Sequence, residues 1–196
     1  RPAWSLGHLG RPVPRPKIFD KYTEGMTPAA GDKHIGLTLR CAPDWDYLKA
    51  LRDEWDGPLI VKGILDPEHA GALLEHGADA LWVSSHAGRQ FEAAPAPLPA
   101  LVQVREAVGP DVPLIYDGAV RSGTDVLRAI ALGADLVMLG RGFHYGVAAA
   151  GLAGAHQVVH ILSEEMRLDM AQLAINRPIE ARGRARVQWP TTTTLP

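Results

Sequence analysis

The stretches "GADALWV" at residues 77–83 and "GADLVML" at residues 133–139 repeat one short element at two places in the chain. In each stretch a glycine can close a helix, an alanine is small enough for close packing, and an aspartate leads into an apolar strand. Short, nearly continuous apolar runs of this kind are typical of parallel strands buried on both faces. We therefore expect four strands, over residues 58–62, 80–85, 113–117 and 135–140.

Helical patterns separate these runs. In "DPEHAGALLEHG" (66–77), Asp66 is a candidate N-cap, Pro67 suits the first helical position and Gly77 can end the helix. Residues 98–109 and 122–133 follow the same plan, and residues 43–55 predict a further helix. The alternation predicts right-handed βαβ units in an α/β fold with a parallel sheet. Because the units repeat, a barrel is favoured over an open sheet, and four strands would make half of a TIM (β/α)8 barrel.

Composition limits the class of protein. The chain has 196 residues, 46% hydrophobic and 21% charged, with a net charge of -2. The chain has no surplus of basic residues that would indicate nucleic-acid binding, and its single cysteine cannot form a disulfide framework. No apolar run approaches the roughly 18 residues needed to span a bilayer. The first residues lack a methionine and a signal peptide's apolar core, so the chain is expected to begin inside a longer one. We divide it into a loop-rich segment (1–41), the half-barrel (42–174) and an irregular tail (175–196).

Polar or hydrogen-bonding residues stand at the carboxyl end of each predicted strand. A lone lysine at a strand end is more often a solvated loop charge than a functional group. Four adjacent strands that all end in such groups favour a site, because TIM barrels carry their active sites at the carboxyl ends of the strands. The residues concerned are Lys62, Ser84, His86, Asp117, Gly140 and Arg141.

The ends of the last two strands predict a phosphate site. "DGAVRSGTD" (117–125) is a small-residue turn that runs into a helix, where free backbone N–H groups favour an anion, and "GRG" (140–142) repeats the pattern. Arg121 and Arg141 could donate charge-assisted hydrogen bonds to phosphate oxygens. The alternative is that the glycines serve tight turns and the arginines serve the surface. These residues leave open whether the ligand is a phosphorylated substrate or a phosphate-bearing cofactor.

Four motifs occur in order: "LIVKGIL", "WVSSHAGRQ", "DGAVRSGTDVLRAIALGADLVMLGR" and "GLAGAHQVVHILSEEMRLDMA". From about residue 35 to residue 173, the chain resembles the C-terminal half of the FMN-dependent 2-hydroxy acid dehydrogenases and oxidases. That family includes L-lactate dehydrogenase, glycolate oxidase and mandelate dehydrogenase. The resemblance implies strands 5–8 of the barrel, with the N-terminal half supplying the first four. It also implies FMN as the cofactor and an L-2-hydroxy acid, similar to L-lactate, as the substrate.

The resemblance also implies a role for individual residues. His86 matches the catalytic base and Arg89 the residue that binds the substrate carboxylate, for which a planar guanidinium is well shaped. Lys62 matches the lysine at the N1/C2-carbonyl edge of the flavin, and Ser84 a serine that hydrogen-bonds the ring. The phosphate and ribityl site is matched by Asp117, Gly118, Ala119, Val120, Arg121, Gly140 and Arg141.

Three positions depart from the family pattern. Ser85 and Ala87 stand where the family usually has asparagine and glycine, and Ala119 stands where the phosphate turn usually has its second glycine. Alanine still offers a backbone N–H, but it does not hold a positive φ without cost. None of the changes removes a reacting group. They bear on substrate choice and loop geometry more than on the chemistry.

Partners and location are implied only by the resemblance. The electron acceptor could be oxygen, a quinone or a cytochrome, and the family implies a homo-oligomer (a tetramer), in the cytoplasm or peripheral at the inner membrane. His156 and His160 stand four apart on an expected helix, but no further ligand is near in sequence, so no metal site is expected. Two alternatives stay open: another phosphate-binding or FMN-dependent TIM-barrel enzyme, and a non-catalytic half-barrel fragment.

Overall fold

The computed structural model describes residues 43–188, and its helices and strands alternate as the sequence predicts. The predicted segment 1–41 lies outside the described residues. The strands are β1 (Ile60–Ile64), β2 (Ala80–Val83), β3 (Leu114–Asp117) and β4 (Leu136–Met138). The helices are α4 (Trp45–Glu54), α5 (Pro67–Glu75), α6 (Pro97–Val108), α7 (Gly123–Ala131) and α8 (Arg141–Gln172), with short 3-10 helices η2 (His86–Gly88) and η3 (Pro178–Ala181).

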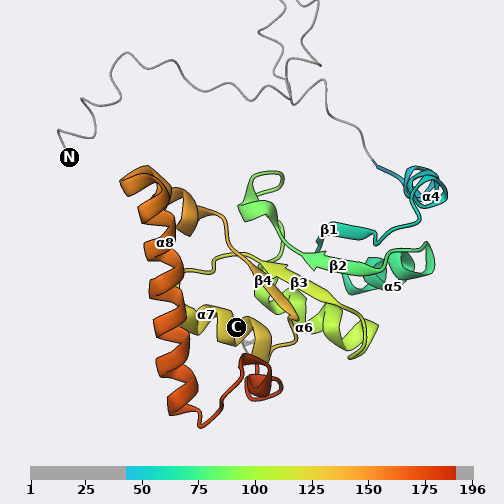
Figure 1. Ribbon diagram of the computed structural model, residues 1–196. Coiled ribbons are helices and arrows are strands. Elements are labelled where there is room, and N and C mark those ends of the chain that lie inside the picture. Colours follow the sequence, from blue (N-terminus) through green and yellow to red (C-terminus); the bar gives the residue numbers. More distant parts are fainter. Residues whose placement is uncertain (1–42, 189–196) are drawn as a thin grey trace, which may run out of the picture. The chain divides into compact units, whose positions relative to one another are not determined.

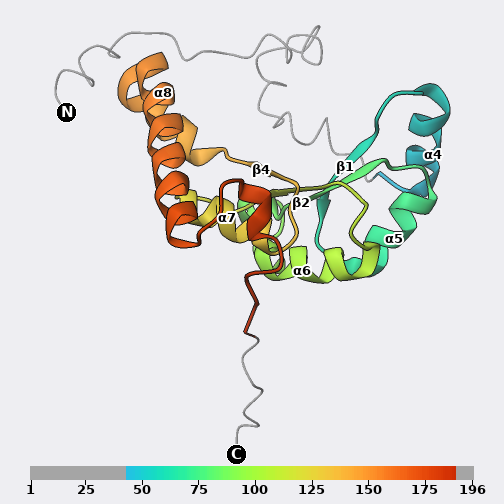
Figure 2. The same cartoon turned by 60° about the horizontal axis from the view of Figure 1, so that its bottom comes forward.

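The four strands form one parallel sheet in the order β1-β2-β3-β4. Each strand therefore pairs with the strand that precedes it in the chain, and an intervening helix returns the chain to the amino end of the sheet (Figure 1). Figure 2 shows α5, α6 and α7 together on one side of the sheet. This is the arrangement of successive βα units in a barrel wall.

The predicted N-caps of α5 and α7 are confirmed, whereas α6 begins after Ala96 without a side-chain cap. The Asp66 carboxylate accepts a hydrogen bond of 2.9 Å from the backbone N–H of Glu68, and Pro67 is the first helical residue of α5. Ser122 Oγ accepts one of 3.1 Å from the backbone N–H of Asp125 at the start of α7. These caps begin each helix directly after its strand, so the connecting loops stay short.

The two faces of the sheet differ. Leu81, Val83, Leu114 and Tyr116 face the helices and are at most 2% exposed. On the other face Ile60, Leu136 and Met138 are 47%, 51% and 39% exposed. The expectation that both faces are buried is therefore not met by the described residues, because they supply helices for one face only.

A bulge at Gly63 lets β1 serve both faces. Lys62 pairs with Trp82, but Ile64 pairs with Val83, so Gly63 is the extra residue, with φ 97°. Lys62 thus lies on the open face while Ile64 is buried at 8% exposed. The sequence placed Lys62 at the end of its strand, whereas the strand continues to Ile64. The alternation of side chains along a strand, with a period of two, does not reveal a bulge.

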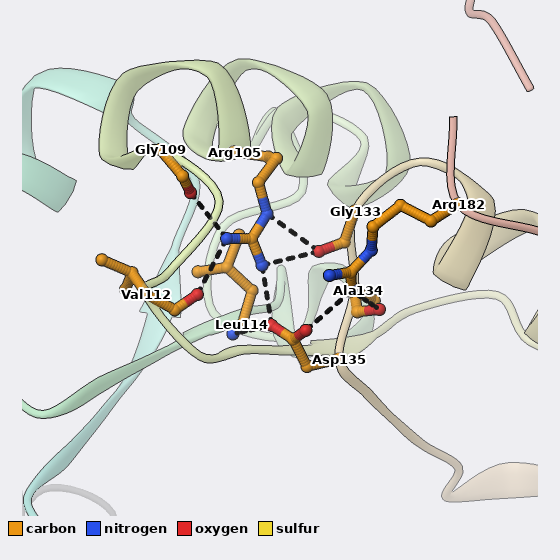
Figure 3. Close-up of polar contacts among 8 residues, drawn as sticks. All are labelled: Arg105, Gly109, Val112, Leu114, Gly133, Ala134, Asp135 and Arg182. Atoms are coloured by element: carbon orange, nitrogen blue, oxygen red, sulfur yellow. Dashed lines mark hydrogen bonds and ion pairs between the residues drawn. The ribbon is translucent and has the colours of Figure 1, made fainter. Parts of the chain in front are cut away.

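At the amino ends of β3 and β4, Arg105 of α6 fastens the loops together (Figure 3). Its guanidinium donates to the carbonyl oxygens of Gly109, Val112 and Gly133 at 2.7–3.0 Å. It also pairs with Asp135 at 2.7 Å, and Arg182 holds the second oxygen of that carboxylate at 2.6 Å. The Leu114 N–H donates to Asp135 at 2.8 Å, which links the starts of the two strands.

The repeated "GAD" element forms the same arrangement of arginine, carbonyl oxygen and aspartate at β1 and β2. We call each arrangement an arginine clamp. Arg52 of α4 donates to the Gly77 carbonyl and to Asp79, each at 3.0 Å, and the Leu59 N–H donates to Asp79 at 2.7 Å. A Cβ on Gly77 would lie 2.6 Å from Arg52 Cδ, and one on Gly133 would lie 2.8 Å from Arg105 Cγ. Both glycines therefore leave room for an arginine. The clamps stabilise the amino ends, opposite the edge where the site is expected.

Helix α8 is, among the described helices, the one whose length and average composition would allow it to cross a membrane. Its backbone leaves the helical region at Ala150 and Gly151, which divides it into 141–149 and 152–172. The first segment is too short for a bilayer of about 30 Å. The second carries four charged residues between positions 164 and 169. This geometry favours two surface helical segments over a membrane span.

Candidate active site

Three side chains from the carboxyl ends of neighbouring strands form one hydrogen-bonded network. Lys62 Nζ donates to Ser84 Oγ at 2.7 Å and to Asp117 Oδ2 at 2.8 Å. Ser84 Oγ donates to Asp117 Oδ1 at 2.6 Å, and Ser84 is only 1% exposed. The structure therefore brings together three of the residues that the sequence selected, although they are up to 55 positions apart in the chain.

The loop after β2 turns in the left-handed region. His86, Ala87 and Gly88 have φ of 50°, 58° and 73°. Ser84 Oγ fixes the turn by accepting the backbone N–H of His86 at 3.1 Å, and the Arg89 N–H returns to the His86 carbonyl at 3.2 Å. Ala87, one of the three departures, thus holds a positive φ, at a cost of about 1–2 kcal/mol relative to glycine.

The side chains of four basic residues on these loops have no hydrogen-bond or ion-pair partner within residues 43–188. All four are exposed: His86, Arg89, Arg121 and Arg141. They follow β2, β3 and β4, whereas Arg52 and Arg105 at the amino ends are fully engaged with carbonyls and carboxylates. Guanidinium groups left without protein partners in this way are suited to an anionic ligand such as a carboxylate or phosphate.

The turn after β3 is packed closely against α6. A Cβ on Gly118, which has φ 140°, would lie 2.4 Å from Pro97 Cγ. Tyr116 donates its hydroxyl to the Gly118 carbonyl at 2.7 Å, and burial raises the pKa of Tyr116 to about 12, with Asp117 and Asp125 adding to the effect. Ala119, the second small residue of the turn, has φ 54°. The backbone therefore keeps a conformation that favours glycine although alanine occupies the position.

The start of α7 offers fewer free N–H groups than the sequence indicates. The Gly123 N–H donates to Glu165 of α8 at 2.6 Å, and the Arg121 N–H donates to Asp125 at 3.0 Å. With the Ser122 cap on Asp125, these amides are occupied by protein groups. The pKa of the Asp125 carboxyl is lowered because the Arg121 amide, Ser122 and Arg128 together outweigh its burial.

The start of α8 remains open. Its N-cap is Gly140, which has no capping side chain, and its first turn contains no acidic residue. The backbone amides of residues 118–120 likewise have no acceptor among the described residues. The open amides of these two segments, with Arg141 at the helix start, could hold a phosphate.

One cavity lies away from this edge, between α7, α8 and η3. Its volume is about 310 Å³, and its lining contains none of the predicted site residues. Residues 43–188 contain no group of three or more histidine, cysteine, aspartate or glutamate side chains that could hold a metal ion.

Residues 1–186 match the family model described as FMN-dependent dehydrogenase. The chain belongs to this family. The resemblance drawn from its motifs is thereby confirmed. Curated relatives of the chain include proteins named L-lactate dehydrogenase. The one from Caulobacter sp. (strain K31) is 41% identical over 89% of this chain and 46% of its own length. The one from Acinetobacter baylyi is 41% identical over 86% and 44%.

Solved structures of a mandelate dehydrogenase and a mandelate oxidase superpose on this chain. A monotopic membrane protein, (S)-mandelate dehydrogenase, has a TM-score of 0.81 at 30% identity, over 93% of this chain and 48% of that one. A mandelate oxidase mutant with a monooxide FMN adduct has a TM-score of 0.69 at 36% identity, over 74% and 46%. The chain therefore spans about half the length of the relatives it matches.

Sequence reasoning missed two residues near the site. Glu165 occupies an amide that the sequence assigned to an anion, and no local pattern connects it with a turn 42 positions earlier. Trp82 was taken only as part of a buried strand. The alternation of β2 would have placed it on the same face as Lys62 once the register of the two strands was known.

Proposed function

We propose that this chain supplies strands 5–8 of an FMN-binding TIM barrel that oxidises an L-2-hydroxy acid, similar to L-lactate, to the 2-oxo acid. The observation that carries the proposal is the Lys62–Ser84–Asp117 network beside unpaired basic side chains at one edge of the sheet. Membership of the FMN-dependent dehydrogenase family and relatives named L-lactate dehydrogenase support it. The alternatives, another phosphate-binding or FMN-dependent TIM-barrel enzyme and a non-catalytic half-barrel fragment, are not favoured.

The residues present fit FMN. The phosphate would lie against the free amides of residues 118–120, the start of α8 and the guanidinium groups of Arg121 and Arg141, while Asp117 can accept from a ribityl hydroxyl. Ser84 would hydrogen-bond the ring. Lys62 would place a positive charge near the N1/C2-carbonyl edge, where negative charge develops when the ring is reduced. FMN, when bound, supplies the acceptor for the two electrons of the substrate.

His86 and Arg89 would handle the substrate. Arg89 would bind the carboxylate with its planar guanidinium, and His86 would accept a proton from the 2-hydroxy acid. Both side chains are exposed and leave the same left-handed turn, which Ser84 anchors from below. The turn therefore couples the position of the base to the network that would hold the flavin.

The whole protein would need further parts. The N-terminal half would supply four strands and cover the open face of the sheet, and a family-type homo-oligomer is part of the proposal. Oxygen, a quinone or a cytochrome would reoxidise the flavin. Peripheral attachment to a membrane is supported by the name of the monotopic (S)-mandelate dehydrogenase that superposes on this chain, and not by a membrane-spanning role of α8. A cytoplasmic location is the alternative.

The decisive experiment is anaerobic reduction of the flavin-loaded protein, with the N-terminal half supplied if the chain alone retains no flavin. We expect flavin absorption bands that L-lactate bleaches and D-lactate does not. His86→Ala should retain FMN but slow reduction by about 10²–10⁴-fold, the contribution of a positioned general base. His160→Ala, on the exposed surface of α8, is the matched control. A His86→Ala protein that reduces within a few-fold of wild type would remove His86 from the mechanism.

A further inference from the structure

Trp82 lies directly beside Lys62 on the open face of the sheet. The two residues are register partners on β1 and β2, so their side chains leave neighbouring strands on the same side. Lys62 Nζ lies 4.5 Å from the centroid of the Trp82 ring, which is within the range of a cation–π contact. The ammonium of Lys62 therefore has three neighbours: Ser84, Asp117 and the indole face.

Hydrogen bonding within the described residues does not explain a tryptophan at this position. Its Nε1–H is buried and has no acceptor among residues 43–188. A buried N–H without an acceptor costs about 1–3 kcal/mol, and an aliphatic side chain would avoid this cost. What the indole does contribute here is its π face, which lies against the ammonium.

We propose that Trp82 is a positioning residue for Lys62. Its ring holds the ammonium over β2, next to Ser84. The positive charge is therefore directed toward the flavin edge and does not interact with Asp117 alone. A cation–π contact suits this task because it restrains a cation without transferring a proton or adding a full negative charge. The inference rests on the proposed function, since it gives Trp82 a part in FMN chemistry through Lys62.

Sulfite provides a readout that is separate from turnover. Sulfite adds reversibly to N5 of oxidised flavin and leaves a negative charge on the N1/C2-carbonyl edge, so its affinity reports on positive charge held there. In the flavin-loaded protein, Trp82→Leu should weaken sulfite binding by between about twofold and thirtyfold, the range of a cation–π contact. Trp82→Phe keeps a weaker π face and should fall between Leu and wild type.

A matched control and a double-mutant cycle separate positioning from general damage. Trp55→Leu removes an exposed tryptophan near the amino end of β1 and should leave sulfite affinity unchanged. In a Lys62→Met background, Trp82→Leu should cause no further loss, because the ammonium it positions is gone.

Equal sulfite affinity in wild type, Trp82→Phe and Trp82→Leu would overturn the inference, and so would an undiminished Trp82→Leu effect in the Lys62→Met background. If the Trp82→Leu protein does not retain flavin, sulfite affinity is compared among wild type, Trp82→Tyr and Trp82→Phe instead. The wild-type protein should then bind sulfite more tightly than either variant. Failure of the wild-type protein to bind FMN, with its N-terminal half present, would instead refute the proposed function and with it the role given to Trp82.

Discussion

At the scale of single residues, positive φ angles mark where the backbone is under strain. Among residues 43–188 the non-glycine positions are His86, Ala87, Ala119 and Ala174. The first three lie in the loops of the candidate active site, and two of these are alanines where the family pattern has glycine. Strain at such positions persists when the surrounding contacts determine the loop, as Ser84 does for His86.

Ala174 offers a test that leaves the site untouched. It follows α8 with φ 52°, and the Ile175 N–H returns to the Met170 carbonyl at 3.0 Å, so it occupies the position where helices favour glycine. We expect Ala174→Gly to raise the free energy of unfolding by about 1 kcal/mol, because glycine avoids the steric cost of the left-handed conformation. Chemical denaturation measures this.

The control is Ala107→Gly in the exposed surface of α6, which should lower stability by about 0.5–1 kcal/mol. Destabilisation by both variants would mean that Ala174 does not hold a strained conformation.

At the scale of elements, the two arginine clamps fix the amino ends of the strands. Arg105 contacts three carbonyls and one carboxylate and is 14% exposed, and burial lowers its pKa although Asp135 opposes the shift. We expect Arg105→Met to lower the free energy of unfolding by about 3 kcal/mol, because it leaves part-buried carbonyls without donors and Asp135 without one of its two arginine partners. Arg167→Met, which breaks only an exposed pair with Glu164, should change stability by less than about 1 kcal/mol.

These two losses would be compared by denaturant titration monitored by circular dichroism. Equal losses in the two variants would show that the clamp is no stronger than a surface ion pair.

Asp135 makes the clamp sensitive to acid. Burial acts to raise the pKa of Asp135, but the Leu114 amide, Arg182 and Arg105 outweigh it, and the pKa is lowered. On acidification the unfolded chain therefore binds the proton first, near the ordinary value of about 3.9, and stability falls until the folded carboxyl is also protonated. Asp135→Asn should flatten the dependence of unfolding free energy on pH as the pH falls below about 5. An unchanged slope in that variant would contradict this assignment.

At the scale of the molecule, the open face of the sheet determines behaviour in solution. Ile60, Leu136 and Met138 expose apolar surface there, and β1 and β4 have no neighbour on their outer edges among the described residues. Unpaired edges beside apolar surface are sites of association. The proposed N-terminal half of the barrel would cover both.

We expect the 196-residue chain, purified alone, to associate as its concentration rises in sedimentation velocity. Replacing Leu136 and Met138 together by lysine should reduce that association, because the charges make burial of this face costly. Gln103→Lys on the outer surface of α6 adds charge elsewhere and should have little effect. A chain that remains a 21.1 kDa monomer throughout would show that the open face needs no partner.

The sequence by itself determined the order of the elements, the N-caps of α5 and α7, and which polar residues stand near the carboxyl ends of the strands. Asp66, Pro67 and Ser122 act on residues within one turn of themselves, so local pattern is enough to predict them. The repeated "GAD" element also predicted two equivalent turns, although not the arginines that use them.

Only the tertiary structure decided which groups meet at the site. The pairing of Lys62 with Asp117, the occupation of the Gly123 amide by Glu165 and the position of Trp82 under Lys62 all join residues far apart in the chain. Strand register sets the two contacts of Lys62, and the packing of α8 against α7 brings Glu165 to Gly123. A one-residue change of register would move each strand side chain to the opposite face, so no local pattern could have established the contacts of Lys62.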